Sequence, residues 1–194
     1  MIESGPDPNL QPIWIDVGQV LQRTVTSLYS HLVTRPTGRA VRLAIETQLQ
    51  SAGERSLSLI DLSEVVVIDF SCADEVVAKL LESAHASPRH EAYFVFGGVH
   101  EPHRDQIETV LERRGLAAVA ETDQHTFALL GRVTEAEERM WRELERRGVV
   151  SEDELGAVLP DGNAVQLLIE RRLALRSPRS GRLHALSRLV RSPQ

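Results

Sequence analysis

The chain has 194 residues, of which 42% are hydrophobic and 26% are charged, and its formal net charge is −6. These fractions are ordinary for a globular protein. The sequence contains no apolar run near the roughly 18 residues that would cross a bilayer. Its first residues lack the pattern of a signal peptide, and its single cysteine excludes an internal disulfide. We therefore expect a cytoplasmic protein without a membrane partner.

The charge is unevenly distributed along the chain. From Arg171 to Gln194 the sequence holds seven arginines and no acidic residue, which leaves 15 of the 22 basic residues against 28 acidic residues elsewhere. The formal charge is therefore about +7 in this tail and about −13 in the rest. An acidic body repels nucleic acid, whereas a basic tail attracts nucleic acid or an acidic protein.

The first quarter of the chain predicts a disordered lead and two helices. Residues 1–13 are rich in proline and are expected to be disordered. The apolar residues of Val17–Leu32 have helical spacing, although Thr24–Thr26 would also suit a strand. Thr34–Gly38 indicates a break in regular structure, and a second amphipathic helix is expected to cover Val41–Leu49.

Two short apolar stretches come next. Ser56–Leu62 is expected to form a strand, and the β-branched run Val65–Ile68 is typical of a strand that is covered on both faces. Asp69 or Ser71 is placed to cap the following helix, because a short side-chain oxygen can accept a free N–H of the first turn.

The pattern of alternating strands and helices continues. Tyr93–Phe96 predicts a central strand that ends at Gly97, and Arg104–Arg114 has the spacing of an amphipathic helix. Leu116–Ala120 predicts a short strand and His125–Leu130 a final short helix. Such an alternation is typical of an α/β domain with helices packed on a sheet.

The last third of the chain has a different pattern. Thr134–Glu137 and Ser151–Glu154 both have the form of a capping box, and Asp161 stands where a third helix would begin. Leu173–Arg176 and Arg182–Leu186 alternate around a turn rich in Ser, Pro and Gly, which indicates a β-hairpin. Three short helices followed by a basic hairpin resemble a winged helix.

We therefore predict a two-domain α/β protein. Residues 14–131 would form a sheet with packed helices, residues 132–191 a small winged-helix-like domain, and residues 192–194 a short tail.

The stretch Leu59–Leu81 resembles the STAS domain, which anti-sigma-factor antagonists share with the cytoplasmic tails of sulfate transporters. Ile60–Val65 is similar to the family's strand-end pattern, and Ile68–Ala73 stands where the family has Ile-Asp-Ser-Ser-Gly-Leu. The later elements also follow the family's order, so the resemblance covers about residues 30–131.

The resemblance implies a recognition or phosphorylation loop at Asp69, Ser71 and Asp74. In the family, a partner kinase that is also an anti-sigma factor phosphorylates the first serine after the aspartate, and the added charge breaks the complex. Phe70 occupies that position here, and Ser71 is the next hydroxyl. Cys72 replaces the family's glycine, and we interpret it as a small buried residue rather than a reactive thiol.

The winged-helix-like segment offers a second set of contact residues. Asn163 and Gln166 lie in the third helix and can read adenine edges. The hairpin and its flanks carry four arginines that could lie along phosphates or pair with an acidic protein: Arg172, Arg176, Arg179 and Arg182.

The sequence predicts no catalytic, metal or cofactor site. We find no nucleophile, base and orienting group in a suitable pattern. His100 and His103 lie close together, but zinc needs three or four ligands, and Gly97-Gly98 is too short for a phosphate-binding loop.

These observations predict a non-enzymatic bacterial regulatory protein that works by protein recognition in the manner of an anti-sigma-factor antagonist. Its partner would be a kinase or anti-sigma-like protein or a second copy of the chain, and the winged helix would make a second contact. One alternative is a DNA-binding transcription regulator whose STAS-like domain dimerises or senses a ligand. Another is a structural or assembly adaptor.

Overall fold

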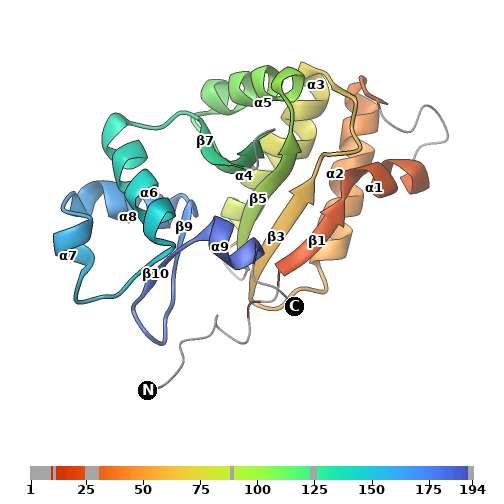
Figure 1. Cartoon of the computed structure of the whole chain (residues 1–194). Helices are drawn as coiled ribbons and strands as arrows, with labels where there is room; N and C mark the ends of the chain where they lie inside the picture. Colours follow the sequence, from red (N-terminus) through yellow and green to blue (C-terminus); the bar gives the residue numbers. More distant parts are fainter. Residues whose placement is uncertain (1–9, 11, 25–30, 88–89, 123–125, 192–194) are drawn as a thin grey trace.

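A five-stranded, mostly parallel sheet runs through the middle of the protein (Figure 1). The computed structural model describes residues 10, 12–24, 31–87, 90–122 and 126–191. The parallel strands of the sheet, in spatial order, are β1 (Pro12–Asp16), β3 (Arg55–Asp61), β5 (Glu91–Val99) and β6 (Ala117–Thr122). The last strand, β7 (Phe127–Gly131), pairs with β6 in the antiparallel direction.

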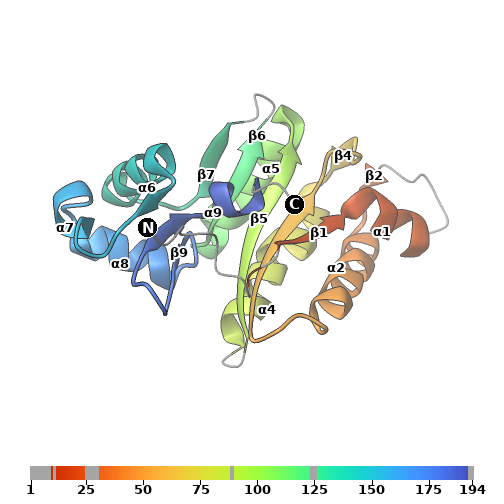
Figure 2. The same cartoon turned by 60° about the horizontal axis from the view of Figure 1, so that its bottom comes forward.

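Helices cover one face of this sheet (Figures 1 and 2). They are α1 (Val17–Thr24), α2 (Arg35–Leu49), α3 (Phe70–Ala73), the π-helical segment η1 (Asp74–Lys79), α4 (Leu80–Ala86) and α5 (Glu101–Arg114). A separate parallel pair, β2 (His31–Leu32) and β4 (Val67–Ile68), leads into α2 and α3.

The C-terminal unit, residues 132–191, contains a small antiparallel sheet in the order β8-β10-β9. Its elements are α6 (Glu135–Arg147), β8 (Val149–Val150), α7 (Leu155–Val158), α8 (Gly162–Glu170), β9 (Ala174–Arg176), β10 (Leu183–Ala185) and α9 (Leu186–Val190). The predicted hairpin is present as β9 and β10.

The C-terminal unit covers the second face of the central sheet. Leu57, Tyr93 and Val119 from the sheet share one buried cluster with Trp141 and Leu186 from the unit. Helix α9 contacts β3 and β5 directly and lies across the sheet in Figure 2. The two parts predicted from the sequence therefore share a hydrophobic core.

Local signals in the sequence identified several helix ends. The capping box at Thr134 and Glu137 is formed, and Asp161 accepts the Ala164 N–H at the start of α8. Gly115 ends α5 in the left-handed conformation that favours glycine. By contrast, Ser151–Glu154 does not cap α7, because Glu154 itself is the residue before that helix and makes no side-chain cap bond.

Several other expectations about elements were wrong. The helix predicted over Val17–Leu32 is present as α1 at Val17–Thr24, but His31–Leu32 form strand β2, and residues 25–30 lie outside the described residues. Pro12 and Ile13, assigned to the lead, belong to edge strand β1, where a proline at the first position removes no sheet bond. Thr34–Gly38, predicted as a break, begins α2, because Thr34 precedes the helix and Pro36 lies in the first turn, where its missing N–H is harmless. Residues 127–130 form a strand rather than a helix, because Phe127 and Leu129 face the second core while Leu130 faces the first.

Another wrong expectation concerns β5, which continues past the two glycines. Gly98 has a φ of +63°, and the register of β5 with β6 shifts between Phe96 and Val99. The glycines therefore accommodate a bulge within the strand instead of ending it.

Candidate functional site

Asp69 and Ser71 lie together at the start of α3. Asp69 precedes the helix with an extended backbone, and its Oδ1 accepts the Cys72 N–H at 2.8 Å. The Ser71 hydroxyl donates to the same carboxylate at 2.9 Å. Both side chains are partly exposed. The backbone N–H of Asp69 donates to Leu32 O at 2.8 Å, which fixes this turn against β2.

The neighbouring residues of the motif have structural roles. The Phe70 ring packs against the first core, and the Arg113 guanidinium lies 4.8 Å from its centre. Cys72 is fully buried, and its thiol donates to Thr34 O at 3.0 Å. Burial and the nearby Asp69 carboxylate raise the pKa of the Cys72 thiol to about 12. The reading of Cys72 as a buried packing residue agrees with this environment.

Asp74 does not share the exposed position of Asp69 and Ser71. It is 5% exposed and accepts hydrogen bonds from Arg35 and Arg114, each at 2.7 Å. Glu75, 2% exposed, accepts from Arg35 at 3.0 Å and from Arg42 at 3.3 Å. We call these residues, with Lys79, the ionic cluster.

The basic partners lower the pKa values of both carboxylates. Burial alone would raise the pKa of Asp74, but the hydrogen bonds from Arg35 and Arg114 outweigh it and the pKa is lowered. The pKa of Glu75 is lowered in the same way, with burial opposed by Lys79, Arg35 and Arg42. The cluster therefore links α2, η1 and α5 by ion pairs.

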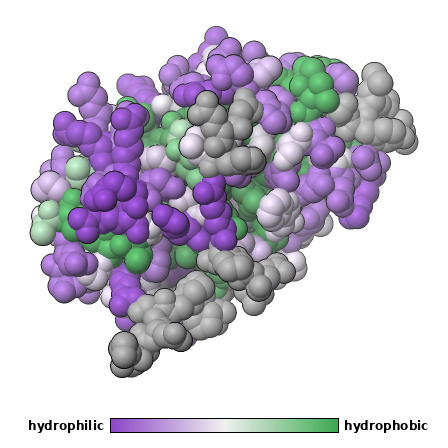
Figure 3. Space-filling view, viewed as in Figure 1, coloured by the Kyte–Doolittle hydropathy of each residue, from purple (hydrophilic) through white to green (hydrophobic). Residues whose placement is uncertain are grey.

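Three exposed valines lie in or next to the short β2–β4 pair, which is followed in the chain by Asp69. Val33, Val66 and Val67 are 48%, 61% and 39% exposed, and we call them the valine patch. The β2–β4 register pairs Leu32 with Ile68, and the Asp69 N–H donates to Leu32 O, so Val33 and Asp69 follow directly on two paired strands. Figure 3 shows a hydrophobic area near the top of the molecule, over the loop that joins β3 to α3. An apolar patch therefore adjoins the carboxylate and hydroxyl.

The arginines of the tail differ in their accessibility. Arg172 donates from Nη1 to the carbonyl oxygens of Ala84 and Ala92 at 3.1 and 3.2 Å, between the C-terminal unit and the central sheet. Arg176 forms an ion pair with Glu152 at 2.8 Å. Arg179 is exposed and Arg182 is partly exposed, both at the hairpin turn.

The outer face of α8 is polar but not basic. Asn163 and Gln166 are exposed, and Gln166 donates to Glu170 at 2.9 Å. Leu167 is 41% exposed on the same face. Arg171, which follows the helix, forms a 2.6 Å ion pair with Glu137 and donates to Arg132 O. The basic groups of the tail therefore do not form a row along α8.

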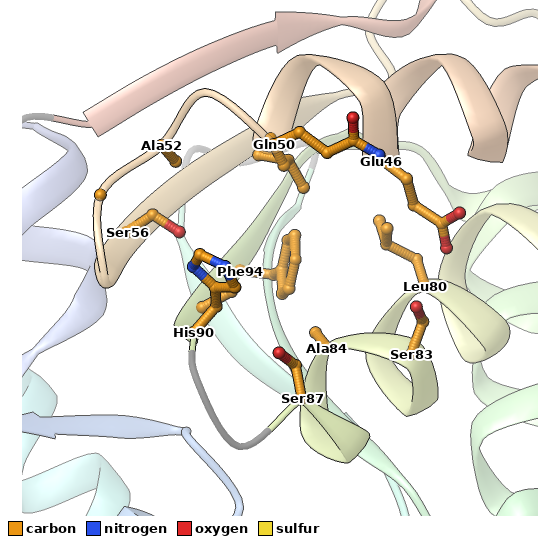
Figure 4. Close-up of a pocket in the computed structure, with 13 residues that line it drawn as sticks. Glu46, Gln50, Ala52, Ser56, Leu80, Ser83, Ala84, Ser87, His90 and Phe94 are labelled. Atoms are coloured by element: carbon orange, nitrogen blue, oxygen red, sulfur yellow. The ribbon is translucent and has the colours of Figure 1, made fainter.

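A pocket of about 300 Å³ opens near the amino ends of β3 and β5 (Figure 4). The Phe94 ring faces its interior, and the Ser56 hydroxyl and the His90 imidazole lie to one side. Ser83 from α4 and Glu46 from α2 lie on the other sides, and Glu46 is paired with Arg42 at 2.8 Å. The pocket's apolar groups and hydroxyls suit contact with a small uncharged molecule.

Sequence reasoning located the Asp69–Ser71 turn but missed the ionic cluster and the valine patch. The signal for the cluster was present, since Asp74 and Glu75 interrupt an otherwise apolar helix. Their partners Arg35 and Arg114 come from distant helices, which no local pattern links to them.

Among the described residues, no group of three His, Cys, Asp or Glu side chains could hold a metal ion, and no helix has the length and hydropathy needed to span a membrane. No protein-family model, curated protein or solved structure matches this chain.

Proposed function

We propose that this is a non-enzymatic regulatory protein that binds a partner protein through the valine patch and the Asp69–Ser71 turn. The STAS-like motif at residues 60–73 supports the comparison with anti-sigma-factor antagonists, in which the same turn is the recognition element. The C-terminal unit, winged-helix-like in its order of elements, would provide the second contact.

The main support for this proposal is the exposure of Val33, Val66 and Val67 near the turn that carries the Asp69 carboxylate and the Ser71 hydroxyl. Clustered apolar side chains on a surface favour burial by another molecule, at about 25 cal/mol per Å² of apolar area. Asp69 and the exposed Glu64 add negative charge at the edge of the patch. The partner would therefore present an apolar surface bordered by basic residues.

Ser71 is the position at which such a complex could be switched. Its hydroxyl donates to Asp69, and a phosphate there would lose this donor and add about −1.5 to −2 charges beside a carboxylate. Repulsion would displace the Asp69 side chain from its bond to Cys72 N and alter the turn that borders the valine patch.

A contact of the C-terminal unit with protein is favoured over one with DNA. Arg171, Arg172 and Arg176 bind groups of this chain, and only part of the tail's charge faces outward. The exposed helix α8 carries Leu167 and Glu170 next to Asn163 and Gln166, a mixture that suits a protein surface better than phosphates.

The test compares the proteins that bind to the immobilised full-length chain with those that bind to its Val66→Glu and Val149→Glu variants. Val149 is 44% exposed on β8 and serves as the matched control. A specific partner should be retained by the wild type and the Val149→Glu variant and lost by Val66→Glu, and the same loss should be measured with the purified partner. Equal binding to all three would overturn the proposal.

Two further measurements separate the alternatives. Light scattering would show a dimer that Val66→Glu converts to a monomer if the partner is a second copy. A salt-dependent mobility shift of duplex DNA, lost when Arg179 and Arg182 become alanine, would instead favour the DNA-binding function.

A further inference from the structure

A second hollow lies at the carboxyl ends of the parallel strands. It is on the same face of the sheet that the C-terminal unit covers nearer the middle of the strands. Its volume is about 370 Å³, and its lining includes Trp14 on β1, Asp61 on β3, Gly97 on β5 and Glu121 on β6. In open α/β sheets, the carboxyl ends of the strands are the usual place for ligand sites.

The strand register explains how the hollow forms. Leu59 pairs with Val95, and Val95 with Val119, so these three side chains form a row across the sheet that the second core covers. Two residues further along, Asp61 pairs with Gly97. Gly97 has no side chain to fill the next row, so the row contains a gap between acidic residues.

The glycine is surrounded closely enough to define the floor of the hollow. A Cβ atom added to Gly97 would lie 3.2 Å from Leu59 Cδ1 and 3.8 Å from Glu121 Oε2. The Glu121 side chain therefore reaches over the glycine from β6. On the other side, Asp61 Oδ1 accepts the Ser63 N–H at 2.9 Å, which fixes its carboxylate.

Trp14 supplies an aromatic wall. Its side chain is on edge strand β1, and the residue is 65% exposed. The indole Nε1 donates to Asp61 Oδ2 at 3.2 Å, which ties the ring to the carboxylate. The π-face of an exposed aromatic ring attracts cations, and the carboxylate beside it attracts them by its negative charge.

The chain already places a cation next to this hollow. Arg191, after α9, donates from Nη2 to Glu121 Oε1 at 3.4 Å, and its guanidinium lies 4.5 Å from the centre of the Phe127 ring. The same carboxylate and an aromatic ring thus hold a guanidinium at the border of the hollow.

We infer that this hollow binds a small organic cation, an amine or guanidine compound whose charged group lies between Asp61 and Glu121 and whose carbon chain lies against Trp14. Carboxylates bind such groups by charge-assisted hydrogen bonds. The aromatic wall favours an organic cation over a hydrated metal ion.

The test uses agmatine, which carries an ammonium and a guanidinium group, and follows the fluorescence of Trp14 in the full-length protein. The other tryptophan, Trp141, is 3% exposed, so it responds little to a ligand at the surface. Agmatine should give a saturable change with a dissociation constant below about 1 mM. Magnesium chloride and the neutral n-butanol should give none at equal concentration.

Variants assign the binding to the hollow. Asp61→Asn and Glu121→Gln should each weaken agmatine about tenfold or more by calorimetry, while Glu112→Gln, an equal charge change at an exposed site on α5, should bind as the wild type does. Arg191→Ala should strengthen binding, because it removes the internal competitor for Glu121. The inference is overturned if agmatine does not saturate, if all charge variants weaken it equally, or if magnesium binds as well.

Discussion

Arg114, in the last turn of α5, donates from Nε to Oδ1 of Asp74 at 2.7 Å, and this bond connects two helices across the first face of the sheet. Asp74 is 5% exposed and receives Arg35 on its other oxygen. The π-helical turn η1 begins at Asp74. Such turns place side chains differently from a regular helix, and here the turn brings two consecutive carboxylates, Asp74 and Glu75, to the ionic cluster.

Arg114→Ala should therefore destabilise the fold by about 1–3 kcal/mol, because the buried Asp74 carboxylate loses a charge-assisted partner. The control is Arg142→Ala, whose ion pair with Glu138 is at the surface and whose loss should cost about 0.5 kcal/mol or less. Urea unfolding followed by circular dichroism gives both values. Equal effects of the two changes would contradict a structural role for the cluster.

The same cluster should make stability fall in acid. The pKa of Asp74 is lowered in the folded state by its arginine partners, against the effect of burial, so the unfolded chain binds more protons at mildly acidic pH. The stabilisation is therefore complete above the ordinary pKa of aspartate, about 4, and is lost as the pH falls through the lower folded value. Unfolding measured from pH 6 to pH 3 should show this decline, with a smaller slope in Asp74→Asn. An unchanged slope in that variant would place the acid sensitivity elsewhere.

The sequence was sufficient where structure is determined by neighbours along the chain. The Thr134–Glu137 capping box and the Asp69 cap depend on residues three positions apart, and both are present. Strand β1 could not be predicted in the same way, because Pro12–Asp16 becomes a strand only by pairing with β3, more than 40 residues away.

The candidate site was predictable to the same extent. The sequence placed Asp69 and Ser71 at the start of a helix because a cap is local, and Asp69 forms that cap. The valine patch was missed because Val65–Ile68 has the composition of a strand covered on both faces. In the structure only Val67 and Ile68 pair, with a two-residue strand, and Val66 and Val67 face outward.

Cys72 should be unreactive in the folded protein. Burial and the neighbouring Asp69 raise its pKa to about 12, so the thiolate that attacks alkylating reagents is scarce at pH 8. Iodoacetamide should leave native Cys72 unmodified and modify it fully in concentrated denaturant, as seen by intact mass. Rapid labelling of the native protein would show that the thiol is accessible and ionised.

Gly98→Ala should be strongly destabilising. Gly98 has a φ of +63°, and a Cβ there would lie 2.5 Å from the backbone nitrogen of Ser63, so both the backbone conformation and the space exclude a side chain. We expect a loss of about 2–4 kcal/mol. Gly156→Ala is the control, since no heavy atom lies within 4 Å of its added Cβ and its φ is not positive. A thermal shift that is the same for both variants would contradict the bulge geometry.

The shared second core predicts that the chain unfolds as one unit. Leu57 and Tyr93 of the sheet are buried with Trp141 and Leu186 of the C-terminal unit. Urea transitions followed by Trp141 fluorescence in a Trp14→Phe background and by far-ultraviolet circular dichroism should therefore coincide.

Arg172 contributes to this coupling through its bonds to Ala84 and Ala92. Arg172→Ala should lower the midpoints of both transitions together and reduce the free energy of unfolding by about 1–3 kcal/mol. Arg176→Ala, which removes only the surface pair with Glu152, should reduce the free energy of unfolding by about 0.5 kcal/mol or less.

A chain that ends at Gly131 should expose the apolar face of the sheet and bind the dye ANS. If that fragment instead remained monomeric, bound no dye and unfolded at the original midpoint, the sheet would be stable without its C-terminal cover.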